Sequence, residues 1–270
     1  MSLLTQKGYH SLWVWPILLI AIFFIVNFII TNRQATHPIV HFHTLFSKKP
    51  FVGATMAISS HLTLLTGIAG INVYIVRILK LPFDISLHFY FFFFVGVIIT
   101  GILKMFFYSS VGAGFLGTLG SSALLYVSIH WIILGNTINI PLLYIQGLLL
   151  GFGASMTLVS GSMATLLDGD LKEAAQRSQT MHTMRNFSAA MLIPIIAYTI
   201  KNHIQKGTQS IYAENITDKM IYLKKLQDVA IDADHQIFLL MIIFNMVMFV
   251  SSIIQMILGK GRRITPPRES

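Results

Sequence analysis

Seven apolar segments of membrane-crossing length divide most of this chain, and they restrict its possible folds more than any other feature. A transmembrane helix needs about 20 predominantly apolar residues. Such segments lie at about Leu12–Thr31, Val52–Val76, Leu87–Tyr108, Val111–Leu134, Ile140–Leu167, Met181–Lys201 and Gln236–Leu258. Charged residues make up only 11% of the chain, whereas a soluble domain has roughly 25%. The sequence therefore predicts an all-α integral membrane protein with about 7 transmembrane helices.

The first segment is predicted to remain in the protein as a linker helix. Its apolar part has about 20 residues, longer than the roughly 7–15 of a signal peptide, and no small-residue cleavage site follows it. We divide the chain into this linker helix with its cytoplasmic connector (1–50), a six-helix bundle (51–260) and a basic tail (261–270). Within the bundle, residues 202–235 are predicted to form an extracytoplasmic loop with one short surface helix.

Basic residues near the segment ends predict the orientation. With the amino terminus outside, the cytoplasmic side receives Arg33, Lys48, Lys49, Lys104, Lys172, Arg177, Arg185, Lys260, Arg262, Arg263 and Arg268. The opposite side receives Lys7, Arg77, Lys80, Lys201, Lys206, Lys219, Lys224 and Lys225. Because cytoplasmic loops are enriched in Lys and Arg, we expect the carboxyl terminus in the cytoplasm. The basic residues behind the net charge of +9 then lie in the loops that set the membrane orientation. The expected partner is the lipid bilayer rather than nucleic acid.

One face of the second segment carries a stripe of hydroxyl groups and small residues. At 100° per residue, the residues that share this face are Thr55, Ser59, Thr63, Thr66, Gly70 and Tyr74. Such a stripe either lines a water-filled cavity or bonds to a neighbouring helix. His61 lies on another face together with Asn72. An intramembrane histidine is either a proton-linked group or a neutral ring bonded to a neighbouring helix.

Small residues predict close helix packing in the fourth and fifth segments. Gly114, Gly117 and Gly120 recur every three residues, and Gly147 and Gly151 share one face of the fifth segment. We expect the packing faces of the stretch Ile140–Lys201 to fit helices that the chain does not contain. In the sixth segment, Pro194 interrupts the apolar run and Arg185 lies within it or just before it. Gln146 is a further polar group at membrane depth.

The sequence offers no set of residues for catalysis, for a cofactor or for a metal. His37, His41 and His43 cannot all lie on one helical face, and no acidic residue or cysteine is near them. All ten acidic residues fall in predicted loops or tails, so a proton-linked group in this chain would have to be a histidine. The chain has no cysteine, which excludes disulfides and thiol chemistry. We therefore expect a protein that is not an enzyme.

Several short motifs resemble those of one transporter family. Arg33, His37 and Pro38 match a segment of the form R-x-x-x-H-P-L-L-D-L-x-L-F, with His41 where aspartate is usual. An E-E-A-G loop followed by T-L-R-Q-L-G-G-A is matched at Glu173, Ala174, Thr183, Arg185 and Ala190, and Tyr74 fits the tyrosine of an L-P-L-Y-L element. In order and spacing these motifs resemble the C-terminal half of a 14-helix major facilitator superfamily drug:proton antiporter of the EmrB/QacA type.

The resemblance implies that the chain corresponds to helices eight to fourteen and lacks the first seven. It implies efflux of small amphipathic molecules across the cell's inner (cytoplasmic) membrane, coupled to protons when an N-terminal half is present. The implied substrate pathway holds Thr55, Ser59, Thr63, Tyr74 and Gln146, with His61 linked to protons. The residues with an implied packing or conformational role are Gly114, Gly117, Gly147, Gly151, Arg185 and Pro194.

One departure from the family pattern concerns the loop after the third segment, which reads GILKMFFYSS. Met105 and Phe106 stand where the family has a charged pair, so the ionic latch of that loop is not expected. The alternative to a transporter half is a non-transporting multi-pass membrane protein, either the remnant of a split gene or a scaffold that pairs through its glycine faces.

Overall fold

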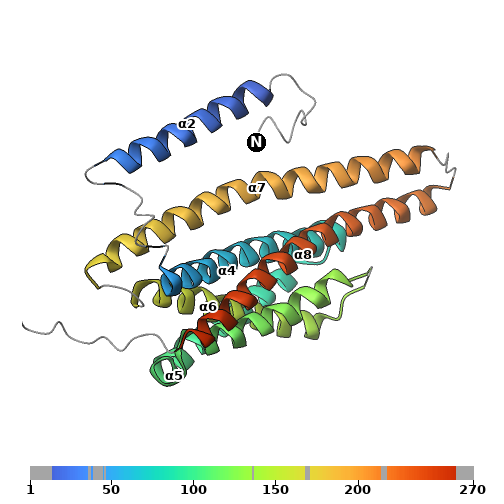
Figure 1. Cartoon of the computed structure of the whole chain (residues 1–270). Helices are drawn as coiled ribbons and strands as arrows, with labels where there is room; N and C mark the ends of the chain where they lie inside the picture. Colours follow the sequence, from blue (N-terminus) through green and yellow to red (C-terminus); the bar gives the residue numbers. More distant parts are fainter. Residues whose placement is uncertain are drawn as a thin grey trace, which may run out of the picture.

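The computed structural model describes residues 14–35, 38, 45, 47–135, 137–167, 171–213 and 218–259, and all their regular elements are helices (Figure 1). The elements are α2 (Val14–Gln34), α4 (Lys48–Asn72), the π-helix η1 (Val73–Ile78), α5 (Phe83–Ile132), α6 (Ile140–Leu167), the short 3-10 helix η2 (Leu171–Glu173), α7 (Ala174–Ala213) and α8 (Lys219–Ile257). The predicted all-α class is confirmed.

Four of these helices are long and apolar enough to cross a membrane: α4 continued by η1, α5, α6 and α8. A shorter apolar helix, Leu19–Gln34, lies within α2. Helix α7, which contains the predicted sixth segment, is not among the four. The chain is thus a helical membrane protein, and the count of seven spans stays a prediction.

Helix α5 is two helices joined at a sharp bend. A straight helix of 50 residues would be about 75 Å long, far more than the roughly 30 Å of a bilayer core. At Gly112 the backbone takes φ 82° and ψ 170°, a conformation that is essentially restricted to glycine. We call residues 83–111 the first limb and residues 113–132 the second limb. The sequence sets the boundary between these segments at Tyr108–Ser110, slightly before the observed bend.

The order of contacts along α6 gives the direction of each limb. In the first limb the contacts advance with α6, from Phe89 beside Gly147 to Phe93 beside Gly151. In the second limb they run backwards, from Gly120 beside Gly153 to Trp131, which is bonded to Gln146. The two limbs are therefore antiparallel, and both pack on α6.

The other helices continue this alternation. Helix α4 runs antiparallel to α6, with Gly53 against Gly161 and Ser60 against Thr157. It also runs antiparallel to α8. Met56 of α4 lies beside Ser252 of α8 near one end, and Gly70 of α4 lies beside Phe238 of α8 near the other. Helix α7 packs on the outside of α4 and α8 through Leu62, Leu192, Ile196 and Ile237. From α4 to α8, successive segments run in opposite directions.

Glycine faces allow the closest approaches in this bundle. A Cβ atom on Gly147 would lie 2.8 Å from the carbonyl oxygen of Phe89, and one on Gly151 would collide with the carbonyl of Phe93. A Cβ atom on Gly117 would lie 2.6 Å from the sulfur of Met56. Helices of this same chain cover the glycine face of α6, so for Gly147 and Gly151 the expectation of helices absent from the chain is wrong.

The segment 202–235, predicted as a loop with a short helix, is mostly helical. Helix α7 continues through Pro194 to Ala213, and α8 begins at Lys219, where the Asp218 side chain accepts a hydrogen bond of 2.7 Å from the backbone N–H of Met220. Figure 1 shows both helices extending beyond the ends of α4, α5 and α6. The helices persist because they pack on each other, with Gly207 against Val229.

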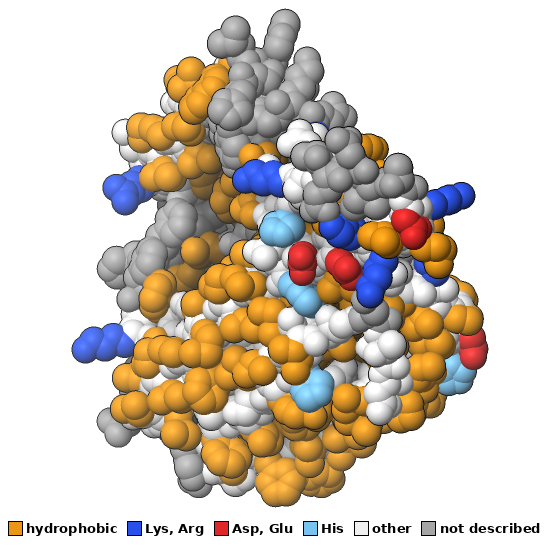
Figure 2. Space-filling view, turned by 90° about the vertical axis from the view of Figure 1, so that its right-hand side faces the viewer, with side chains coloured by type: hydrophobic (Ala, Val, Ile, Leu, Met, Phe, Trp, Pro, Cys, Tyr) orange, Lys and Arg blue, Asp and Glu red, His pale blue; other side chains and the backbone are white. Residues whose placement is uncertain are grey.

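The bundle has two distinct ends. The bend end holds the α5 bend, the start of α4 and the end of α6, and the hairpin end holds η1, the start of α6 and the α7–α8 extension. Basic residues assigned to the cytoplasmic side lie at the bend end: Lys48, Lys49, Lys104, Lys172 and Arg177. Figure 2 looks onto the hairpin end, where charged and histidine side chains gather on one part of a largely hydrophobic face.

Candidate functional site

A single stripe of α8 is buried against the centre of the bundle. Its members recur every three or four residues: Ile231, Asp234, Phe238, Met241, Asn245, Met248, Ser252 and Gln255. This period keeps them on one helical face. Three of them are a carboxyl group or amides, which are uncommon in an apolar core unless they are paired. The polar interior of the bundle is therefore the candidate functional site.

Asp234 is the most unusual member of this stripe. Its residue is 2% exposed, and neither carboxyl oxygen has a hydrogen-bond partner in the described part of the chain. Ile231 and Phe238 flank it on the same face, and both belong to the main core together with Tyr74. The prediction that the seventh segment begins at Gln236 and that Asp234 lies in a loop is wrong, because the residue lies buried within α8.

Polar groups from three other elements, η1, α5 and α6, belong to this part of the core. The indole N–H of Trp131 donates a hydrogen bond of 2.8 Å to the Oε1 of Gln146, whose Nε2 has no partner among the described residues. The Tyr74 hydroxyl donates to the carbonyl of Gly135, and the phenol also interacts electrostatically with Asp234. We call Asp234, Tyr74, Trp131 and Gln146 the hairpin-end cluster. Tyr74 and Gln146, two residues of the expected substrate pathway, both belong to this cluster.

The hydroxyl stripe of α4 faces the interior of the bundle. Ser59, Thr63 and Thr66 are buried, while Thr55 is half-buried. The hydroxyl groups of Thr55 and Thr63 donate bonds of 2.9 and 2.8 Å to carbonyls four residues earlier in α4. These bonds satisfy the threonine hydroxyls within their own helix. Bonding between helices comes instead from Ser60, beside the stripe, whose hydroxyl lies 2.6 Å from that of Thr157 on α6.

His61 lies on α4 and Arg185 on α7. His61 is half-buried, and it interacts electrostatically with Arg185. The Nε of Arg185 is buried, and no hydrogen-bond partner for it lies among the described residues. Asn72, which the sequence places on the same face as His61, donates a bond of 2.6 Å to the hydroxyl of Tyr90. This face of α4 is separate from the hydroxyl stripe.

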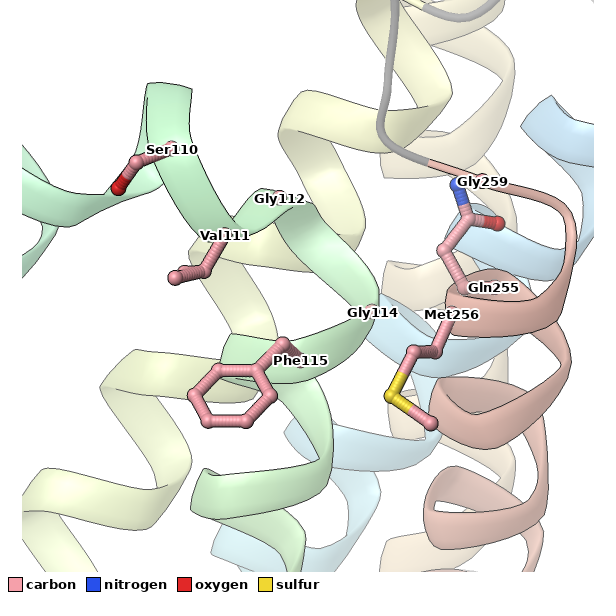
Figure 3. Close-up of a pocket in the computed structure, with 8 residues that line it drawn as sticks. All are labelled: Ser110, Val111, Gly112, Gly114, Phe115, Gln255, Met256 and Gly259. Carbon is pink, nitrogen blue, oxygen red and sulfur yellow. The ribbon is translucent and has the colours of Figure 1, made fainter.

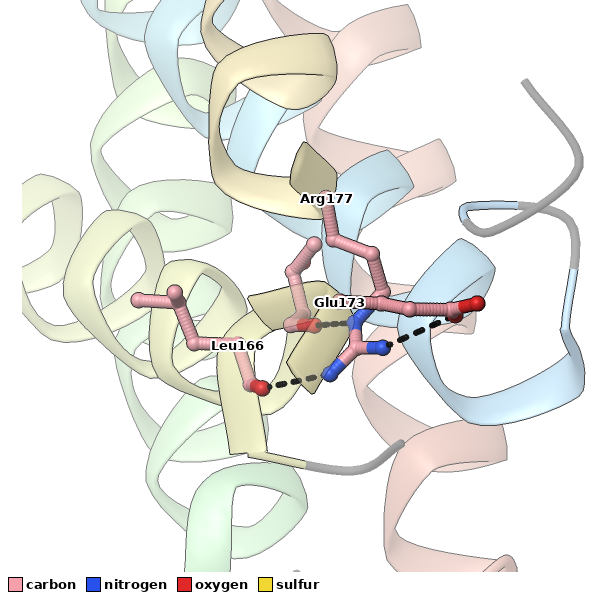
Figure 4. Close-up of polar contacts among 4 residues, drawn as sticks. Leu166, Glu173 and Arg177 are labelled. Atoms are coloured by element: carbon pink, nitrogen blue, oxygen red, sulfur yellow. Dashed lines mark hydrogen bonds and ion pairs between the residues drawn. The ribbon is translucent and has the colours of Figure 1, made fainter. Parts of the chain in front are cut away.

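Arg177 is a buried residue, although the sequence predicts it to be a charge in a cytoplasmic loop. It is 1% exposed, and it donates bonds of 3.0 and 2.8 Å to the backbone carbonyls of Thr165 and Leu166 (Figure 4). Its other terminal nitrogen lies 3.7 Å from Glu173. Because the last carbonyls of a helix lack intrahelical donors, Arg177 closes the end of α6 and ties α7 to it.

A hollow of about 350 Å³ lies at the opposite end from the hairpin-end cluster, beside the α5 bend (Figure 3). The residues that line it are Ser110, Val111, Gly112, Gly114, Phe115, Gln255, Met256 and Gly259. Of the residues singled out in the sequence, only Gly114 contributes to it. The glycines supply backbone alone, so the hollow contains few groups that could orient a ligand.

No group of three or more His, Asp or Glu that could hold a metal ion occurs among the residues described. His37, His41, His43 and the tail 261–270 lie outside the described residues. No protein-family model matches the chain, and no curated protein matches it in sequence.

Proposed function

We propose that this chain is the C-terminal bundle of a major facilitator superfamily type secondary transporter. Completed by an N-terminal half, it exports small amphipathic molecules from the cell, with its carboxyl terminus in the cytoplasm. The observation that supports this proposal best is the arrangement of six helical segments in alternating directions around a polar interior. These segments are α4, the two limbs of α5, α6, α7 and α8. The motifs at Arg33–Pro38 and Glu173–Ala190 give the proposal its family.

In this proposal the two halves rock around a site near the membrane midplane, as secondary transporters do. Thr55, Ser59, Thr63, Tyr74 and Gln146 form this chain's part of the substrate pathway, and Thr55 is the one that is already part-exposed. His61 on α4 and Arg185 on α7 respond together to a change in the packing of those helices. The close packing at Gly114, Gly117, Gly147 and Gly151 keeps the bundle rigid while it moves.

The first test reads the coding DNA upstream of Met1 in all frames. Seven further apolar segments there support the transporter half. Their absence would favour the alternative, a non-transporting multi-pass protein that is a gene remnant or a helix scaffold. In that alternative, α2 provides an apolar surface for pairing with another helix, since most of its described side chains, including Phe23 and Phe24, are exposed.

The second test measures export of a fluorescent amphipathic cation from cells that express the chain together with its upstream half. Changing Ser59→Ala and Thr63→Val together removes two hydroxyls with little change in volume, so we expect several-fold slower export and a normal amount of protein in the membrane. Thr118→Val is the matched control, because that hydroxyl also bonds to its own helix, at 2.9 Å, but lies in α5. Equal export by all three proteins would reject the pathway assignment.

A further inference from the structure

The position of Asp234 demands a physical explanation. An ionised carboxylate buried without a cation or hydrogen-bond donor is strongly unfavourable, whereas burial of the neutral acid costs far less. The residue is 2% exposed, and both oxygens lack a partner in the described part of the chain. A carboxyl group that stays buried in this way needs a proton, and it becomes costly to keep buried once that proton leaves.

Titratable groups on the elements around Asp234 do not supply a compensating charge. Tyr74 on η1 is the group that interacts with it electrostatically, and a neutral phenol brings no positive charge. His235, the next residue of α8, has its Nε2 2.8 Å from the carbonyl oxygen of Leu134. Arg77 on η1 is exposed. At the matching level of α7, neither Lys201 nor His203 forms a hydrogen bond with Asp234.

The helix that faces Asp234 is irregular at this level. From Val73 to Ile78 the chain forms a π-helix, in which the backbone N–H of Leu79 bonds to the carbonyl of Tyr74 at 2.9 Å. Short π-helical segments are frequent at functional sites. Tyr74 belongs to this segment, interacts electrostatically with Asp234, and shares one core with Ile231 and Phe238. A change of charge on the carboxyl group therefore acts on an element that can rearrange.

We propose that Asp234 is a proton-binding site, protonated while its side chain is buried against the bundle, and that loss of its proton loosens the contact between α8 and η1. The bond that breaks is the carboxyl O–H, and the proton passes to water at the hairpin end. The proton site stands on the geometry of this chain alone. The coupling of this proton to export rests on the proposed transport function.

The direct test is infrared spectroscopy of the purified full chain in lipid nanodiscs, with isotopically labelled aspartate. At neutral pH exposed aspartates are ionised, so we expect one labelled carbonyl band of a protonated acid, which disappears as the pH is raised. Asp234→Asn should abolish that band. Asp232→Asn, which changes an exposed carboxyl two residues away on the same helix, should leave it intact. A band that survives Asp234→Asn, or no band at neutral pH in the unchanged chain, would overturn the proposal.

The second measurement tests the loosening and uses the absence of native cysteine. Ile75→Cys places a thiol on η1 at a position that is 1% exposed, and Val76→Cys places one at its 51% exposed neighbour. Below the ordinary thiol pKa of about 8.5, both thiolate fractions rise equally with pH, so the ratio of the Ile75→Cys rate to the Val76→Cys rate cancels the intrinsic effect of pH. We expect this ratio to rise several-fold as the pH is raised, and to stay constant when Asp234→Asn is added. A constant ratio without that substitution would refute the loosening.

Neither measurement needs substrate or a gradient, so each outcome is independent of the export test. If the unchanged chain with its upstream half exports nothing but shows the protonated band, the transport function is rejected and the proton site is retained. A missing band with normal export would reject the proton site alone.

Discussion

At Gly151 the absence of a side chain determines how closely α5 approaches α6. A Cβ atom there would collide with the backbone carbonyl of Phe93, which cannot move away as a flexible side chain could. We expect Gly151→Ala to destabilise the bundle by about 1–3 kcal/mol, the usual effect of overpacking. Thermal unfolding followed by circular dichroism in detergent measures the change.

Gly101 provides the control for that experiment. It lies in the first limb of α5, as Phe93 does, and it is exposed. An added Cβ atom there would have no other atom within 4 Å. Alanine is favoured over glycine inside a helix by roughly 0.5–1 kcal/mol, so Gly101→Ala should leave stability unchanged or raise it slightly. If both substitutions lower the unfolding temperature equally, close packing at Gly151 is not the cause.

Among elements, α5 depends on one backbone conformation. The reversal at Gly112 uses φ 82° and ψ 170°, which side-chain-bearing residues adopt only at a cost of about 1–3 kcal/mol. Gly112→Ala should therefore lower the unfolding temperature although its side chain is small. The chemically identical change Gly101→Ala again serves as control. An unaltered unfolding temperature in Gly112→Ala would mean that the two limbs meet in a different way.

Apolar length predicted where most helices lie, because hydropathy is a local property of the sequence. It failed for residues 202–235, where α7 and α8 are stabilised by packing on each other, as at Gly207 and Val229, and need no continuous apolar run. It also failed for Asp234 and Arg177, since the burial of a single side chain depends on which distant residues cover it. A buried charge next to an apolar segment resembles a solvated loop charge until the neighbouring helices are known.

For the whole molecule, the alternating directions of the helical segments allow a test of its orientation in the membrane. The bend end holds the exposed residues Lys48 and Lys172, and the hairpin end holds the exposed residues Lys206 and Lys224. In a bundle that crosses the membrane, these two pairs face opposite compartments. Since the chain has no cysteine, replacing each lysine singly with cysteine provides one labelling site per variant.

In intact cells, an impermeant maleimide should label Lys206→Cys and Lys224→Cys at once, and Lys48→Cys and Lys172→Cys only after permeabilisation. This result follows because Lys and Arg near short loops favour the cytoplasm, and the bend end carries such residues on α4, the first limb of α5 and η2. The reverse pattern would keep the membrane-crossing bundle and invert its orientation. Labelling of all four from outside would contradict a bundle that crosses the membrane and, with it, every role assigned to its polar interior.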